Sequence, residues 1–152
     1  MSHRPALHRY CFDARWPLAA PPAVVYRELE RVEDYPGWWP QVRRAERSEA
    51  GGGVLHIRSF LPYELVVELV ERRRDPGAGV LEAALTGDMV GEARWRIEAR
   101  GQGTVAVYHQ EVSVTRPLLR WLALPGRPLF SLNHAAMMRA GHRGLARRLA
   151  GG

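Results

Sequence analysis

Tyr35-Pro36-Gly37-Trp38-Trp39-Pro40 places two neighbouring tryptophans inside a turn that is punctuated by proline and glycine. Large aromatic side chains bury more apolar surface than other residues, and a proline-glycine turn is an unusual place for them. These six residues allow two interpretations. The turn either plugs the end of an ordinary core or closes over an apolar cavity as a lid, and a lid would indicate a protein that binds small molecules.

The residues before this turn predict a strand followed by a helix. Apolar and polar residues alternate over 8–18, which is typical of a half-buried strand. The apolar face of that strand consists of Tyr10, Phe12, Ala14 and Trp16. Pro21-Pro22 favours a helix start, and Pro36 ends the helical spacing. The apolar positions of the helix are Val25, Leu29 and Val32.

The residues after the turn predict an antiparallel sheet and then helix. Strand-like segments at 63–71, 92–99 and 104–115 are separated by short turns, which favours a meander over βαβ units. After Pro117 the spacing becomes helical, with a short apolar helix at 118–122 and a final helix from Pro128 to about Leu149. The chain is therefore expected to be an α+β protein, with one domain over 1–152.

The turn at Gly101-Gln102 allows the register of two strands to be predicted. A two-residue hairpin loop there sets Trp95 opposite Tyr108 and Ala93 opposite Gln110. Tyr108 and Gln110 would then share the inward face of the sheet with Trp95. A three-residue loop would turn His109 inward instead, because a one-residue slip inverts every side chain. The aromatic cross-strand pair favours the first register.

The amino-acid composition excludes several classes of protein. The apolar fraction of 46% and charged fraction of 25% argue against disorder. All 22 basic residues are arginine, against 16 acidic residues, and the net charge of +6 favours acidic partners. Because no basic cluster is interleaved with aromatic residues in a nucleic-acid module, no nucleic-acid partner is expected. No apolar stretch is long enough for membrane insertion and no secretory signal is visible, so a cytoplasmic location is expected.

Several catalytic and cofactor signatures are absent from the sequence. The histidines have no ligand-like spacing, so no metal site is expected. No Gly-x-Ser-x-Gly elbow occurs. Residues 101–106 match a dinucleotide fingerprint formally but lie between two strands, so no cofactor is expected. Cys11 lies opposite the apolar face of its strand and has no evident activating partner.

Several motifs lie along nearly the whole chain: 19–26 at the helix entry, 34–42 around the tryptophan turn, Leu61-Pro62-Tyr63, Thr86-Gly87-Asp88, Gly103-Thr104, and Asn133-His134 with Met138, Gly141 and Gly144-Leu145. Together they resemble the START-like superfamily, also called Bet v 1-like, which includes the polyketide cyclase/dehydrase and lipid transport proteins. The resemblance implies a helix-grip fold, in which a curved antiparallel sheet wraps a long C-terminal helix around an apolar cavity. It favours the lid interpretation for Trp38 or Trp39.

The resemblance also implies two functions for one cavity. The first is a polyketide cyclase/aromatase-like enzyme that promotes cyclisation or dehydration of a poly-β-ketone intermediate, delivered by an acidic acyl carrier protein. The second is a non-catalytic carrier of a lipid or other hydrophobic metabolite. A third interpretation is an accessory protein whose cavity has collapsed and whose arginine surface binds a partner.

The candidate site residues follow from these expectations. Tyr108 and His134 are the catalytic candidates. The ligand-binding candidates are Trp38, Trp39, Tyr63, Trp95, Gln110, Asn133 and Met137. Each has a structural alternative: the tyrosines and Met137 can serve as core residues, Gln110 can make a structural hydrogen bond, and Asn133-His134 can bond a loop at the helix end.

Overall fold

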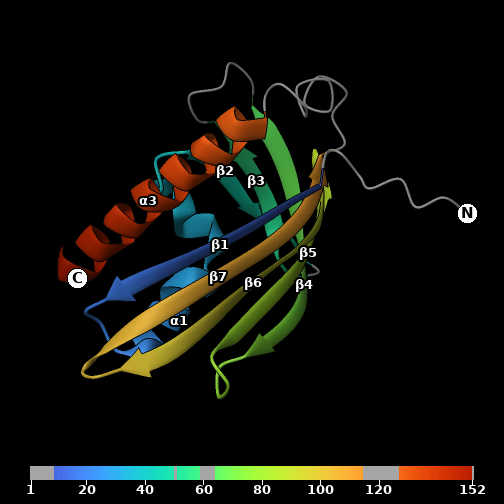
Figure 1. The fold of residues 1–152 in the computed structure, drawn as a ribbon. Helices are drawn as coiled ribbons and strands as arrows, with labels where there is room; N and C mark the ends of the chain where they lie inside the picture. Colours follow the sequence, from blue (N-terminus) through green and yellow to red (C-terminus); the bar gives the residue numbers. More distant parts are fainter. Residues whose placement is uncertain (1–8, 50, 59–63, 115–126, 152) are drawn as a thin grey trace, which may run out of the picture.

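The computed structural model describes residues 9–49, 51–58, 64–114 and 127–151, and for 127–130 only the backbone. Seven antiparallel strands form one curled sheet in the order β1-β7-β6-β5-β4-β3-β2, and α3 lies across its concave side (Figure 1). The elements are β1 (Arg9–Leu18), α1 (Pro22–Glu30), η1 (Val32–Gly37), β2 (Val42–Arg47), β3 (Gly53–Ile57), β4 (Leu65–Asp75), β5 (Val80–Gly87), β6 (Met89–Arg100), β7 (Gly103–Val114) and α3 (Arg127–Gly151). The predicted helix-grip architecture is confirmed, whereas the short helix predicted at 118–122 lies outside the described residues.

The alternation of apolar and polar residues predicted from the sequence determines which side chains of β1 face inward. In β1 the predicted apolar face is inward, with Tyr10, Phe12 and Trp16 buried. β1 pairs with β7 along its whole length, from Arg9 opposite Ser113 to Leu18 opposite Thr104. The first strand of the chain thus borders the last, which brings residues about a hundred positions apart into contact.

The register predicted for β6 and β7 is confirmed. Trp95 pairs with Tyr108, and Ala93 pairs with Gln110. Gly101, the first residue of the two-residue loop, has a φ of +59°. A type II′ hairpin turn needs a positive φ at that position, which glycine adopts at little cost. The turn therefore fixes which β7 side chains face the helix.

The C-terminal half of α3 is docked on the tryptophan turn. At Gly144 a Cβ atom would lie 1.7 Å from the carbonyl oxygen of Trp38, and at Gly141 it would lie 2.5 Å from Cε2 of Trp39. Leu145, in the same half of the helix, is completely buried. The helix can approach this closely only because both positions lack a side chain.

Two polar contacts reinforce this docking. Arg148 reaches from α3 to Glu28 of α1, with Nε 2.7 Å from Oε2. His142 donates from Nε2 to the carbonyl oxygen of Pro17 at 2.8 Å. Together with the glycine contacts, they hold the end of α3 to α1 and to the end of β1.

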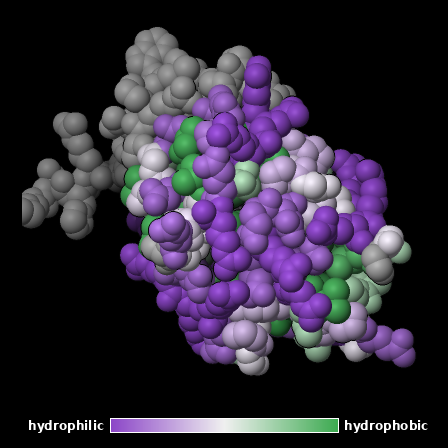
Figure 2. Space-filling model, turned by 180° about the vertical axis from the view of Figure 1, so that it is seen from behind, coloured by the Kyte–Doolittle hydropathy of each residue, from purple (hydrophilic) through white to green (hydrophobic). Residues whose placement is uncertain are grey.

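Few large apolar side chains are exposed among the described residues. The face of the molecule seen in Figure 2 is mostly hydrophilic, with small separate hydrophobic areas. The large exposed apolar residues among those described are Val24, Val66, Val70, Val90 and Leu132. In the part of the chain that the structure describes, no helix is both long and apolar enough to cross a membrane.

The docking of α3 can be tested at Gly144. In Gly144→Ala the new methyl group collides with backbone rather than with a flexible side chain, so the helix must move. We expect this substitution to lower the free energy of unfolding by about 3 kcal/mol, at the upper end of overpacking effects. Urea denaturation followed by tryptophan fluorescence measures the change.

Gly151→Ala is the matched control in the same helix, because nothing lies within 4 Å of its added methyl group. Its free energy of unfolding should stay at the wild-type value or rise slightly. Equal stability of Gly144→Ala and Gly151→Ala would contradict the close approach of α3 to the turn.

Candidate functional site

An internal cavity of about 170 Å³ lies between the concave face of the sheet and α3. Most of its walls are apolar, and they come from the middle strands, from η1 and from α3. The apolar lining includes Leu55, Ile57, Val67, Leu85, Trp95 and Met138. An apolar cavity of roughly 150 Å³ is known to admit a benzene ring in another protein. This partly open space among the described residues therefore suits a ring-sized apolar group of a larger molecule.

Two polar side chains converge on the side-chain oxygen of a third in this apolar cavity. The hydroxyl of Tyr108 donates to Oε1 of Gln110, and Nε2 of His134 lies 3.3 Å from the same oxygen. Because an amide oxygen only accepts, His134 must donate from Nε2, which leaves a lone pair on Nδ1 of the neutral ring. Gln110 thereby aligns two donors toward a single acceptor position.

Burial keeps both donors uncharged. Burial lowers the pKa of His134 from 6.5 to about 4, and it raises the pKa of Tyr108 above its ordinary value. Phe12 stacks on the imidazole of His134 with a centroid distance of 3.7 Å and an interplanar angle of 7°. Near neutral pH the site therefore presents two neutral hydrogen-bond donors and no ionised partner among them.

Asn133 adds an acceptor without a partner. Its side chain lines the cavity, and Oδ1 is buried with no hydrogen-bond partner among the described residues. Leaving a buried acceptor unsatisfied costs about 1–3 kcal/mol. A hydroxyl or N–H group of a bound molecule would remove that cost, so Asn133 contributes an acceptor beside the two donors.

The two tryptophans of the turn occupy different positions. Both are buried, but only Trp39 lines the cavity, where its Nε1 donates to the carbonyl oxygen of Met137 at 2.9 Å. Trp38 is not among the lining residues and stacks on Trp39 with centroids 5.3 Å apart. It also packs edge-on against Trp16 at 6.3 Å. Trp39 thus forms part of the wall, and Trp38 supports it from behind.

The structure brings most of the other candidates to the same cavity. Trp95 lines it and packs on Tyr108 with centroids 4.7 Å apart. Met137 lines it from α3. Tyr63 lies outside the described residues. The candidates Trp39, Trp95, Tyr108, Gln110, Asn133, His134 and Met137 are therefore gathered in one place, as the helix-grip arrangement requires.

Among the residues of the site that sequence reasoning missed, three contact or adjoin the polar group. Phe12 stacks on His134, Met89 places Sδ 3.9 Å from Nε2 of Gln110, and Tyr35 lines the cavity wall. The sequence correctly predicted that Phe12 faces inward. Its place in the site could have been predicted as well if the pairing of β1 with β7 had been known. That pairing sets Phe12 directly opposite Gln110.

Charged side chains surround another part of the cavity. Two ion pairs there link α1 and η1 to the sheet: Glu30 to Arg74 at 2.9 Å and Glu33 to Arg47 at 3.3 Å. The charged lining residues are Glu30, Glu33, Arg47, Glu71, Arg73, Arg74 and Glu82. The cavity therefore has three kinds of lining. Charged side chains lie in one region, uncharged hydrogen-bonding groups lie around Gln110, and most of the remaining wall is apolar.

Comparison with protein families agrees with this geometry. A family model described as polyketide cyclase / dehydrase and lipid transport matches residues 11–150. The chain belongs to this family. A comparison with curated protein sequences finds no match.

Solved structures show the same fold at low sequence identity. A START superfamily protein from Mycobacterium smegmatis is 19% identical with a TM-score of 0.67, and the match covers 93% of this chain and 96% of that one. The Zhui aromatase/cyclase from Streptomyces sp. R1128 is 17% identical with a TM-score of 0.65, covering 90% and 96%. Major latex-like protein 151 from Panax ginseng is 6% identical with a TM-score of 0.69, covering 93% and 97%. These likenesses establish a START-like, Bet v 1-like fold.

The buried histidine makes stability depend on pH. Unfolded His134 takes up a proton below about pH 6.5, whereas the folded protein resists protonation until about pH 4. The unfolded state therefore binds more protons in this window, and stability falls as the pH drops through it. The loss from this group is at most about 3 kcal/mol.

Urea denaturation at about pH 7 and about pH 4.5 measures this loss. His134→Gln cannot titrate and should show a smaller decrease between the two conditions. His142→Gln, in the same helix but bonded to the carbonyl oxygen of Pro17 outside the cavity, should keep the wild-type decrease. An unchanged decrease in His134→Gln would show that His134 is not buried in its neutral form.

Proposed function

We propose that this chain binds an apolar, carbonyl-bearing small molecule in its cavity and promotes cyclisation or dehydration of a poly-β-ketone-type intermediate. The observation that carries the proposal is the convergence of Tyr108 and His134 on the side-chain oxygen of Gln110, inside an apolar cavity. A substrate carbonyl oxygen that displaced Oε1 of Gln110 would meet two donors already in place. The family description and the aromatase/cyclase title of the Streptomyces neighbour support this reaction class.

Positioning of the substrate in the cavity would supply much of the rate acceleration. A flexible poly-β-ketone chain has many conformations, and an enclosing apolar wall reduces them to a few in which the reacting carbons meet. The wall contributed by Trp39 and Trp95 is rigid, since both side chains are buried and packed against other aromatic rings. The cavity would therefore favour one folded form of the chain.

The polar residues would move one proton. Nδ1 of neutral His134 accepts an α-proton that lies between two substrate carbonyls, and the resulting enolate carbon bonds to a second carbonyl carbon. The oxygen of that carbonyl, hydrogen-bonded by Tyr108, accepts the proton back from His134. This step needs no oxidant, reductant or cofactor, because it only relocates the proton. Loss of water then completes dehydration of the ring.

A non-catalytic carrier is the second candidate function. The low pKa of His134 makes it a weak base, which favours a group that orients a ligand over one that removes protons. The same cavity would then hold a lipid or hydrophobic metabolite, in keeping with the lipid-transport part of the family description. Mass spectrometry of ligand extracted from the purified protein separates the two functions, because a carrier retains an apolar molecule and an enzyme releases product.

Delivery by an acidic acyl carrier protein in the cytoplasm belongs to the same proposal. The net charge of +6 supports an encounter with an acidic partner. Such an encounter weakens as salt screens the charges.

The enzymatic role can be tested at Tyr108. In Tyr108→Phe the ring is retained but one donor to the substrate oxygen is lost. We expect the rate of cyclisation of a poly-β-ketone substrate to fall by roughly 10²–10³-fold. Met137→Leu, a volume-conserving change in the cavity wall, is the matched control and should lower the rate by less than about tenfold. Equal rates for wild type and Tyr108→Phe would remove Tyr108 from the mechanism.

Ligand class can be measured by tryptophan fluorescence. Trp39 and Trp95 line the cavity, so a bound aromatic molecule should quench their emission. Saturable quenching by fused-ring aromatic polyketides, but not by long-chain fatty acids, is the expected result. A preference for fatty acids would favour the carrier, and no response to either would contradict a ligand-binding cavity.

A further inference from the structure

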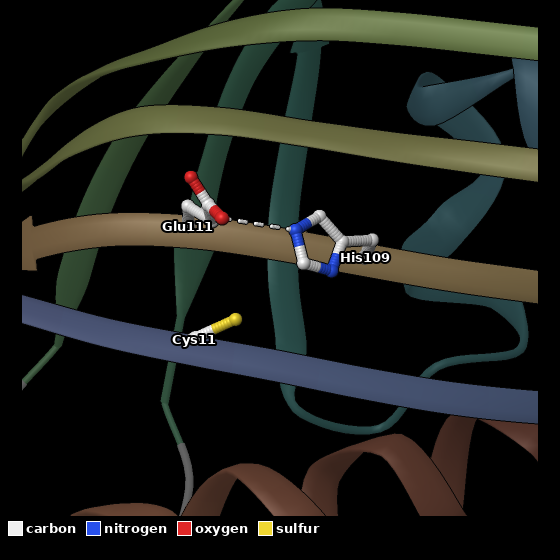
Figure 3. A group of neighbouring side chains, drawn as sticks. All are labelled: Cys11, His109 and Glu111. Atoms are coloured by element: carbon white, nitrogen blue, oxygen red, sulfur yellow. Dashed lines mark hydrogen bonds and ion pairs between the residues drawn. The ribbon is translucent and has the colours of Figure 1, made fainter.

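A second group of chemically active side chains lies on the opposite face of the sheet. Cys11 in β1 and His109 and Glu111 in β7 face away from the cavity (Figure 3). Their ligand atoms, namely Sγ, a ring nitrogen and a carboxylate oxygen, all lie within 4.8 Å of one another. This group has no role in the cavity or in the function proposed for it.

Strand pairing assembles the group. Cys11 is directly opposite Glu111, and Asp13 is directly opposite His109. Within each strand the two residues are two positions apart and so share a face. The four side chains therefore form the corners of a rectangle on the outer surface, with Cβ atoms about 4.5–5.5 Å apart across the strands and about 6.6 Å apart along each strand.

The histidine is oriented as a metal ligand would be. Its Nδ1 lies 2.7 Å from Oδ1 of Asp13, and its Nε2 lies 3.3 Å from Oε1 of Glu111. If Nδ1 carries the hydrogen and donates to Asp13, the lone pair of Nε2 points toward Glu111 and Cys11. A carboxylate on the second ring nitrogen of a metal-bound histidine is a common arrangement, because it fixes the tautomer and raises ligand basicity.

The remaining interactions leave the ligand atoms directed at a common point. Arg9 pairs with Oε2 of Glu111 at 3.2 Å, so the second oxygen, Oε1, faces His109. Cys11 is exposed. Partial desolvation by neighbouring side chains and the carboxylates of Asp13 and Glu111 raise the pKa of the Cys11 thiol, which argues against an activated nucleophile at this position.

We propose that Cys11, His109 and Glu111 bind a divalent transition-metal ion, with zinc as the best match, and that Asp13 positions His109. Thiolate, imidazole and carboxylate together are a zinc-type ligand set, and calcium and magnesium prefer oxygen ligands alone. A tetrahedral zinc ion sets its ligand atoms roughly 3.5 Å apart. His109 and Glu111 already have that spacing, so only the thiol must approach. Three protein ligands leave the fourth position to water.

Cobalt(II) reports directly on such a site, because thiolate coordination produces a charge-transfer band in the near ultraviolet. We titrate the full-length reduced protein with cobalt chloride and then displace the cobalt with zinc chloride. The expected result is one equivalent of cobalt with a saturable thiolate band, abolished by an equivalent of zinc. Absence of the band in the wild-type protein would overturn the proposal.

Substitution of each proposed ligand shows which side chains bind the cobalt ion. Cys11→Ser should abolish the band, and His109→Gln and Glu111→Gln should each weaken cobalt binding by at least about tenfold. Asp13→Asn retains all three ligands and should weaken binding by about 10–100-fold while preserving the band. His142→Gln, which alters a histidine outside the group, is the matched control and should bind as wild type does.

Two outcomes would contradict the assignment. A band of wild-type affinity in both His109→Gln and Glu111→Gln would place the cobalt on Cys11 with other ligands. Equal affinity in Asp13→Asn and wild type would remove the positioning role of Asp13. Circular dichroism of each variant confirms that a lost band reflects a lost ligand rather than unfolding, and these surface positions should leave the spectrum unchanged.

Discussion

The close approach of α3 to the tryptophan turn is the constraint on which the rest of the structure depends. Gly141 and Gly144 allow the helix to contact Trp39 and the backbone of Trp38 at distances that no side chain would permit. The turn is rigid in its own right, because Tyr35 donates from its hydroxyl to the carbonyl oxygen of Leu29 and packs on both indoles. Helix position and turn position therefore determine each other, and neither can shift without losing buried aromatic contact.

This docking divides α3 into two parts with different tasks. The C-terminal part is held by Leu145 and by the ion pair of Arg148, and it acts as a fixed support. The N-terminal part carries Asn133, His134 and Met137 over the sheet, where they line the cavity. Because the support lies at one end, the polar groups of the other end can face a ligand while the helix stays in place. Met138, next to these groups, is itself buried in the core, so the two parts of the helix share the task of stabilising the fold.

Alternation along β7 gives one strand two chemical environments. Tyr108 and Gln110 face the cavity, where burial keeps Tyr108 protonated and the hydrogen-bonding group neutral. His109 and Glu111 face outward beside Asp13, and the ring nitrogens of His109 lie within hydrogen-bonding distance of both carboxylates. The period of two that builds the sheet therefore also separates an apolar ligand site from a polar surface site by the thickness of a single strand. A shift of one residue in the pairing with β6 would exchange them.

Local patterns in the sequence predicted the order of strands and helices and one face of the site, whereas the helix-grip arrangement was implied by the resemblance to the START-like superfamily. Alternating residues in β1, the two-residue turn after Arg100 and the proline-bounded turn each act over a few positions, so their consequences could be predicted, including the inward direction of Tyr108. Tertiary structure alone decided which distant residues meet. Phe12 reaches His134, and Cys11 reaches Glu111, only because the first strand pairs with the last. The spacing of residues along the chain does not predict such contacts. The path of the intervening strands, and not the local sequence, decides which strands become neighbours in the sheet.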